Sequence, residues 1–247
     1  MRDTMTNTVT TAATGPATAS TLPFQAVLFD LDGTLLDTPR AIAEHLVGAA
    51  ADLFGTAPNV DLAQALVGQP LEKMCARLIG VPVSDGRTEQ LVVAYRERYR
   101  ERLVPAAAEL VFPGVQRGLG RLRAHKVQLA VVTSKAHDSA TAILDAAGLA
   151  HYFSTVVGAD DAERPKPHPD PVRLALTRLG VTTDHAAMVG DSTVDIEMGN
   201  ALGVETIAVT YGVADADTLS PFAPTALASS FDQVTQLALR GHQEVPQ

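Results

Sequence analysis

Short apolar runs alternate with amphipathic segments along most of this chain, and this alternation restricts the fold more than any other feature. The predicted strands are 25–30 (QAVLFD), 127–133, 155–158, 186–190 and 205–210, with a weaker one at 226–228. Most of them show no polar/apolar alternation, as expected of strands covered on both faces. The predicted helices between them are 115–125, 137–147, 171–179, 192–202 and 231–240. This order indicates an α/β core with a doubly wound, Rossmann-like parallel sheet.

One interval breaks the alternation. Between Asp37 and Val111 there is no good strand pattern, and helical patterns cover 39–54, 61–66, 70–79 and 87–103. Because this interval is too long for one crossover connection, we expect an inserted α-helical cap subdomain over residues 38–111. The core is then formed by residues 23–37 and 112–247, and residues 1–22, rich in Thr and Ala, are expected to be a disordered tail.

Composition excludes several kinds of protein. A net charge of −9 argues against a general nucleic-acid or membrane-surface binder, and no apolar run approaches the ~20 residues of a membrane span. The basic-looking run YRERYRERL at 95–103 interleaves Arg with Glu at helical spacing, which indicates a solvent-exposed helix face. The only cysteine, Cys75, can form no intrachain disulfide and lies on an apolar helical stripe. We therefore expect a core thiol and a cytoplasmic, reducing location.

Polar side chains recur where the predicted strands end. In open parallel sheets the ligand site lies outside the carboxyl ends of the strands, so these side chains are expected to meet there. Two carboxylates as close as Asp30 and Asp32 repel each other unless a cation lies between them. Together with Asp191 they could surround one Mg²⁺, which prefers oxygen ligands. The strand-end residues are Asp30, Asp32, Thr133, Ser134, Lys166, Asp191 and Asp195.

The neighbours of these acids suggest a phosphoryl group as the ligand. Lys166 lies in the proline-rich loop RPKPHPDP, which would hold its ammonium group in place toward a phosphoryl group. The Thr133 hydroxyl and the Ser134 backbone N–H could bind phosphoryl oxygens, and Gly33 lets the backbone approach the substrate closely. Each part also has a structural explanation: a surface lysine, a turn closed by a hydroxyl, and a capping box made by Ser192 with Asp195.

Four motifs, in order and at sensible spacing, resemble those of the haloacid dehalogenase-like phosphohydrolase superfamily. They are DLDGT at the first strand, VVTS at the second, Lys166 in RPKPHPD, and GDSTVD at 190–195. The resemblance extends from Phe24 to about Gly212. The stretch VVGADDAERPKPHPDP and the later VTYG, together with the helical insert, look most like the phosphoglycolate phosphatase branch.

The resemblance implies a role for each matching residue. Asp30 would be the nucleophile that forms an aspartyl-phosphate, and Asp32 the general acid and then the general base. Mg²⁺ would be bound by Asp30, the Asp32 backbone carbonyl and Asp191, with Asp195 and Ser192 just outside its direct ligands. Thr133 and Lys166 would also act in catalysis. The phosphate-binding set would be Asp30, Leu31, Asp32, Gly33, Thr133, Ser134 and Lys166.

The expected function is a Mg²⁺-dependent phosphomonoester phosphatase that acts on a small phosphorylated metabolite, with 2-phosphoglycolate as the leading substrate. Pyrophosphate, a sugar phosphate or a nucleoside monophosphate are alternatives, since the core motifs read only the phosphoryl group. A β-phosphoglucomutase-like mutase and a non-catalytic phosphate-binding regulatory module are two further alternatives. Specificity is expected from the cap stretch LVGQPLEKM, with Gln69 and Lys73 as candidates. The protein is expected to be a monomer or a homodimer.

Overall fold

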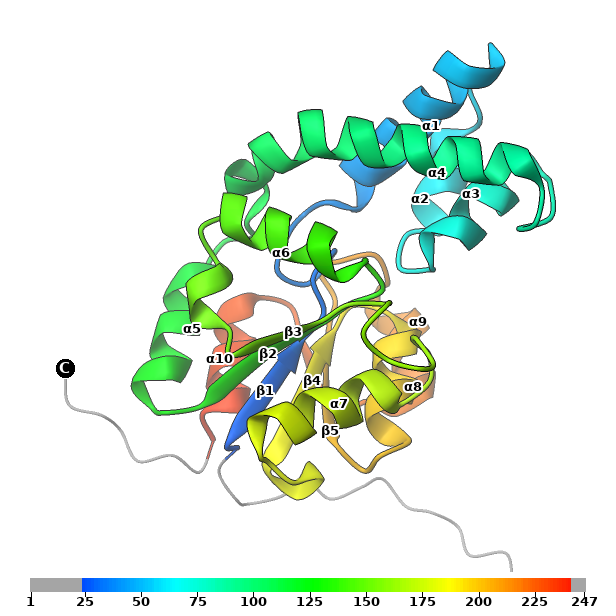
Figure 1. Ribbon diagram of the computed structural model, residues 1–247. Coiled ribbons are helices and arrows are strands. Elements are labelled where there is room, and N and C mark those ends of the chain that lie inside the picture. Colours follow the sequence, from blue (N-terminus) through cyan, green and yellow to red (C-terminus); the bar gives the residue numbers. More distant parts are fainter. Residues whose placement is uncertain (1–23, 241–247) are drawn as a thin grey trace, which may run out of the picture.

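A six-stranded, all-parallel sheet forms the centre of the protein (Figure 1). The computed structural model describes residues 24–240. The strand order is β3-β2-β1-β4-β5-β6, which places β1 between β2 and β4 and confirms the predicted parallel α/β core. The strands are β1 (Ala26–Phe29), β2 (Gln128–Val132), β3 (Thr155–Val157), β4 (Ala186–Gly190), β5 (Glu205–Val209) and β6 (Ala226–Ala228).

Helices cover both faces of the sheet. In β1, Val27 and Phe29 belong to one buried apolar cluster, whereas Ala26 and Leu28 belong to another. The first cluster includes side chains of α5 (Val115–Ala124), α6 (His137–Ala146) and α10 (Phe231–Ala238). The second includes side chains of α7 (Asp170–Leu179) and α8 (Thr193–Asn200). Since both faces of β1 are buried, the strand shows no polar/apolar alternation.

A set of helices, here called the helical insertion (residues 39–110), comes between β1 and α5. It contains α1 (Pro39–Phe54), α2 (Val60–Ala65), α3 (Leu71–Ile79) and α4 (Gly86–Arg98), followed by a π-helical turn (Tyr99–Leu103) and a 3₁₀ helix (Val104–Leu110). In Figure 1 these helices lie beyond the carboxyl ends of the strands, and the 3₁₀ helix at the end of the insertion packs against α6. The insertion thus overhangs the edge at which the strand-end polar residues emerge.

The chain leaves the core and returns to it at neighbouring points. Leu36 forms an antiparallel bridge with Val111, and the Asp37 backbone N–H donates to the Leu110 carbonyl at 2.7 Å. These contacts hold the two connections together near residues 38 and 111, the predicted boundaries of the cap. The division of the chain into core and cap stays a prediction.

Cys75 is fully buried, which confirms a core thiol, and burial raises the pKa of this thiol to about 12.

The element boundaries differ from the predicted ones mainly at helix ends. The helices predicted to reach 202 and 240 end at Asn200 and Ala238, and a short α9 (Ala216–Leu219) was not predicted. Four residues are too few to display a helical period. The predicted N-terminal tail, 1–22, lies outside the described residues.

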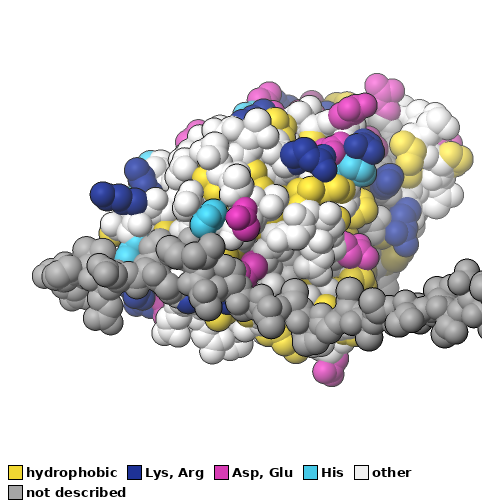
Figure 2. All heavy atoms as spheres, turned by 90° about the horizontal axis from the view of Figure 1, so that it is seen from below, with side chains coloured by type: hydrophobic (Ala, Val, Ile, Leu, Met, Phe, Trp, Pro, Cys, Tyr) yellow, Lys and Arg dark blue, Asp and Glu magenta, His cyan; other side chains and the backbone are white. Residues whose placement is uncertain are grey.

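The face seen from below in Figure 1 is shown in Figure 2. Where grey atoms leave it visible, Lys and Arg side chains lie in small groups interspersed with Asp and Glu. Between residues 24 and 240, no helix is both long and apolar enough to cross a membrane.

Candidate active site

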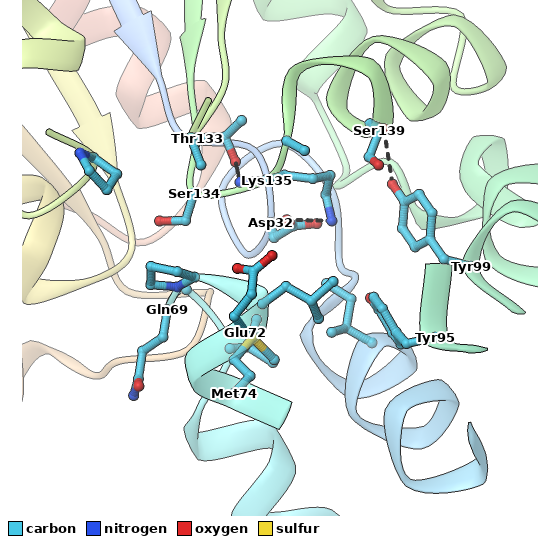
Figure 3. Close-up of a pocket in the computed structure, with 18 of the residues that line it drawn as sticks. Asp32, Gln69, Glu72, Met74, Tyr95, Tyr99, Thr133, Ser134, Lys135 and Ser139 are labelled. Atoms are coloured by element: carbon cyan, nitrogen blue, oxygen red, sulfur yellow. Dashed lines mark hydrogen bonds and ion pairs between the residues drawn. The ribbon is translucent and has the colours of Figure 1, made fainter. Parts of the chain in front are cut away.

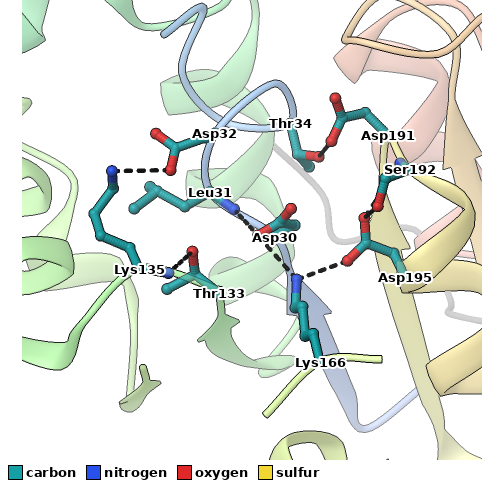
Figure 4. A network of polar contacts seen from close by, with 10 residues as sticks. All are labelled: Asp30, Leu31, Asp32, Thr34, Thr133, Lys135, Lys166, Asp191, Ser192 and Asp195. Atoms are coloured by element: carbon teal, nitrogen blue, oxygen red, sulfur yellow. Dashed lines mark hydrogen bonds and ion pairs between the residues drawn. The ribbon is translucent and has the colours of Figure 1, made fainter. Parts of the chain in front are cut away.

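The site forms where the three neighbouring strands β2, β1 and β4 end. Asp30 follows β1, Thr133 follows β2 and Asp191 follows β4, each directly after the last strand residue. Because β1 pairs in parallel with both neighbours, these three residues emerge at the same edge of the sheet. The predicted convergence of strand-end polar residues is therefore what the fold produces (Figure 4).

Asp30 is the buried carboxylate at the centre of this edge. Its Oδ1 atom accepts a hydrogen bond from the Leu31 backbone N–H at 2.7 Å and lies 3.0 Å from Lys166 Nζ. The Asp30 backbone N–H donates to the Val189 carbonyl of β4, which fixes the residue at the end of the sheet. A short turn follows, in which the Leu35 and Leu36 N–H groups donate to the Leu31 carbonyl.

Asp191 lies on the far side of that turn. Its Oδ2 accepts from the Val213 backbone N–H at 2.7 Å, and its Oδ1 accepts from the Thr34 hydroxyl at 3.2 Å. Gly33 has φ of +86° and lies against this carboxylate, so a Cβ there would collide with Asp191. Gly33 is therefore required for the close approach of the turn to Asp191.

Lys166 and Asp195 form the third part of the site. Lys166 Nζ lies 2.6 Å from Asp195 Oδ1, and both side chains are buried. The other Asp195 oxygen accepts from the Ser192 hydroxyl at 2.6 Å, within a capping box at the start of α8. The capping box and the lysine contact are thus present together, and Asp195 holds Lys166 beside Asp30.

The carboxylates of Asp30, Asp191 and Asp195 offer oxygen atoms that all lie within 4.8 Å of one another. Burial raises the pKa of Asp30, an effect that Lys166 offsets in part and that the charges of Asp195 and Asp191 increase. Burial and the Asp195 charge likewise raise the pKa of Asp191. One ammonium group leaves this cluster short of positive charge, so its donor set fits a hard divalent cation such as Mg²⁺.

The Asp32 side chain contacts residues outside this carboxylate cluster. Its Oδ1 accepts from the Thr38 hydroxyl at 2.6 Å, and its Oδ2 lies 3.1 Å from Lys135 Nζ. Burial alone would lower the pKa of Lys135, but Asp32, Tyr95 and Asp30 together outweigh that effect, so the net shift is upward and the ammonium stays charged. The Asp32 carboxylate is thereby held apart from Asp30, on the side toward the helical insertion.

Thr133 and Ser134 begin the loop after β2. The Thr133 hydroxyl oxygen accepts from the Lys135 backbone N–H at 3.2 Å, so it closes a turn as the structural explanation expected. Its own proton is still free to be donated to a phosphoryl oxygen, because accepting one hydrogen bond does not use it. Both residues line the cavity between the core and the helical insertion, together with Asp30 and Asp32 (Figure 3).

The two predicted specificity residues are placed differently. Gln69 lines the cavity, and its Oε1 accepts from Arg77 at 3.2 Å, whereas Lys73 is exposed and is not among the lining residues. Other residues of the site were not singled out from the sequence. They are Lys135, Thr38 and Tyr99. Lys135 directly follows VVTS, and that position was the one available signal.

Comparison with known proteins agrees with this geometry. Residues 27–209 match the family model described as haloacid dehalogenase-like hydrolase. The chain belongs to this family. A relative in Dickeya dadantii, named probable phosphatase IndB, is 42% identical over 212 residues, which are 86% of this chain and 92% of the relative. A solved haloacid dehalogenase-like hydrolase from Streptococcus pneumoniae superposes with a TM-score of 0.74 at 24% identity, covering 86% of this chain and 97% of that one.

Two further relatives of this haloacid dehalogenase-like phosphatase carry more specific names. A phosphoglycolate phosphatase from Chromobacterium violaceum is 36% identical over 79% of this chain and 89% of its own length. A pyrophosphatase PpaX from Bacillus velezensis is 34% identical over 81% of this chain and 89% of its own length. The predicted resemblance to the phosphoglycolate phosphatase-like branch is confirmed.

Proposed function

We propose that this phosphatase hydrolyses phosphomonoesters through an aspartyl-phosphate formed on Asp30. In the first step an Asp30 carboxylate oxygen attacks phosphorus, the bond from phosphorus to the ester oxygen breaks, and Asp32 gives a proton to the departing alcohol. In the second step Asp32 takes a proton from water, the water oxygen attacks phosphorus, and the bond to Asp30 breaks. The products are the alcohol and inorganic phosphate.

The observation that carries this proposal is the surroundings of Asp30. It is a buried carboxylate with an ammonium group at 3.0 Å and a backbone N–H at 2.7 Å, so it is held in one orientation at the cavity. Lys166 is positioned to neutralise part of the negative charge when a phosphoryl group arrives. Asp32 lies two residues away and lines the same cavity, which supports its assignment as the general acid.

Mg²⁺ is part of the proposal, with Asp30 and Asp191 as the carboxylates that would hold it. When bound, the cation would screen the repulsion between these carboxylates and the phosphoryl oxygens. Asp195 would not need to bind it directly, because its carboxylate already contacts Lys166 and Ser192. We further propose that the helical insertion acts as a cap that excludes water from the cavity, in a cytoplasmic enzyme.

The resemblance and the names of relatives support 2-phosphoglycolate as the first substrate to test, followed by pyrophosphate, sugar phosphates and nucleoside monophosphates. A sugar phosphate mutase would convert a 1-phosphate to a 6-phosphate without releasing phosphate. A non-catalytic phosphate-binding module would hydrolyse nothing in such a panel. Both alternatives are therefore outcomes that the same screen separates from a phosphatase.

The decisive variant is Asp30→Asn, which keeps the shape of the side chain but removes its nucleophilic charge. Phosphate release with Mg²⁺ should fall by at least about 10³-fold, and mass spectrometry of the rapidly quenched wild-type enzyme should find the added phosphate on Asp30. Asp145→Asn, the same change at an exposed position of α6, should leave turnover unchanged. Full turnover by Asp30→Asn, or a phosphate on another residue, would refute the proposal.

A further inference from the structure

The cavity between the core and the helical insertion has two walls of different character (Figure 3). Its volume is about 300 Å³, at the lower end of the range of sites for small organic molecules. The core wall carries the phosphoryl-binding residues Asp30, Thr133 and Ser134. The other wall faces whatever is attached to the phosphoryl group, so its chemistry decides which esters fit.

The wall contributed by the insertion is mainly apolar. Two tyrosines of the run YRERYRERL turn into the protein there, since Tyr95 is 5% and Tyr99 2% exposed. Met74 of α3 and Ile42 of α1 are also almost fully buried at this wall. Its apolar and aromatic side chains are Ile42, Val67, Pro70, Leu71, Met74, Tyr95 and Tyr99.

The two cations among the described lining residues each already contact a carboxylate. Lys135 Nζ lies 3.1 Å from Asp32 Oδ2 and also 4.6 Å from the centre of the Tyr99 ring. Arg96 lies 3.4 Å from Glu72, whose carboxylate points into the cavity in Figure 3. Arg96 has further N–H donors, but an anion that it bound would lie beside the Glu72 carboxylate.

Glu72 and Asp160 also line the cavity and add negative charge to it. A carboxylate or a second phosphate on the substrate would meet these acids and an apolar wall, and it would lose hydration where each nearby cation is already shared with a carboxylate. An uncharged hydrocarbon group at the same place would instead gain by removing apolar surface from water.

We propose that this cavity selects phosphomonoesters whose organic group is uncharged and largely apolar, and disfavours esters that carry a second anionic group. This inference rests on the proposed phosphatase and narrows its substrate class. The preferred substrate would then be neither 2-phosphoglycolate nor pyrophosphate, because each of them carries a second anionic group.

The first test compares esters of closely similar chemical reactivity. For n-alkyl phosphates from methyl to pentyl, kcat/KM should rise by about threefold or more for each methylene group. Isobutyl phosphate has the same number of non-hydrogen atoms as 2-phosphoglycolate but lacks the carboxylate. Its kcat/KM should exceed that of 2-phosphoglycolate by at least about tenfold.

The second test reverses one charge at the cavity. Glu72→Lys should raise the kcat/KM ratio of 2-phosphoglycolate to isobutyl phosphate by about tenfold, because an ammonium group replaces the repelling carboxylate. Glu89→Lys makes the same change in charge at an exposed position of α4 that does not line the cavity, and it should leave the ratio unchanged.

The outcomes separate the two proposals. If the alkyl series is flat, or if 2-phosphoglycolate is hydrolysed at least as well as isobutyl phosphate, the proposed selectivity is wrong although the phosphatase stands. If no ester releases phosphate in the presence of Mg²⁺, not even the reactive phenyl phosphate, the proposed function fails and the selectivity fails with it.

Discussion

Lys135 contacts both the proposed general acid and the helical insertion. Its Nζ atom lies 3.1 Å from Asp32 Oδ2 and above the ring of Tyr99, at 4.6 Å from the centroid. A cation in this position attracts the Asp32 carboxylate and the negative face of the ring at the same time. We infer that Lys135 is a positioning residue, which orients Asp32 without itself reacting.

Replacing this lysine should therefore affect catalysis more than binding. In Lys135→Met the Thr38 hydroxyl alone would hold the Asp32 carboxylate, and kcat should fall by about tenfold or more with a smaller change in KM. Lys135→Arg keeps the charge and should recover part of the loss. Lys126→Met, a change at an exposed position after α5, serves as the control.

The conservative variant separates positioning from general damage to the fold. Partial recovery of kcat in Lys135→Arg would depend on the positive charge beside Asp32, whereas damage to the packing would not be relieved by a bulkier side chain. A Lys135→Met enzyme with unchanged kcat would contradict the assigned role.

At the scale of single residues, the sequence predicted those side chains that directly follow a strand. Asp30, Thr133 and Asp191 could be predicted from the positions of the strand ends alone, because parallel pairing brings residues at those ends together. Thr38 could not be predicted in this way. It precedes Pro39 at the start of α1 and resembles a helix cap, yet its hydroxyl makes no capping bond and donates to Asp32. That choice of partner depends on tertiary contacts.

Among the elements, α4 and the turn that follows it determine how the insertion meets the core. The helix changes to a π-helical turn at Tyr99–Leu103 and then to a 3₁₀ helix, which returns the chain toward Val111. The Tyr99 hydroxyl donates to the Ser139 carbonyl of α6 at 3.2 Å. Tyr99 thus links the insertion to the core beside the cavity, and π-helical turns are frequent at functional sites.

The contribution of this link can be measured with Tyr99→Phe. The variant keeps the ring below Lys135 but removes the hydroxyl, and the free energy of unfolding in urea should fall by about 1 kcal/mol. Tyr152→Phe, which alters a partly exposed tyrosine on the core, should change it by less than about 0.5 kcal/mol. Equal effects of the two substitutions would argue against the link.

The elements themselves were predicted more reliably than their ends. Helical period and glycine stops locate α6 and α7 closely, with Gly148 and Gly180 in the left-handed conformation just beyond them. The π-helical turn was not predicted, because Tyr95–Leu103 has a continuous helical pattern of Arg and Glu. Local periodicity carries no information on how a helix end must bend to return to the sheet.

The whole molecule combines a net charge of −9 with a buried cluster of carboxylates at one edge of its sheet. Folding brings Asp30, Asp191 and Asp195 together, and Lys166 compensates only part of their charge. Since the pKa values of Asp30 and Asp191 are raised in the folded state, that state binds more protons than the unfolded chain above the ordinary carboxyl range. The contribution of these two groups to the free energy of unfolding is fully present below the ordinary carboxyl pKa range. It is lost as the pH rises through their raised pKa values in the folded state.

The metal-free protein should therefore melt at a lower temperature at pH 8 than at pH 6. Mg²⁺ at about 100 times its dissociation constant should raise the melting temperature at pH 8 by roughly 5–10 °C, because it binds only the folded cluster. Asp191→Asn should melt higher than the metal-free wild type at pH 8 and gain little from Mg²⁺, since it removes both a repelling charge and a ligand. Asp145→Asn, on the exposed face of α6, should respond to Mg²⁺ as the wild type does. An equal Mg²⁺ response in Asp191→Asn would place the cation elsewhere on the molecule, and the carboxylate cluster would then need another explanation.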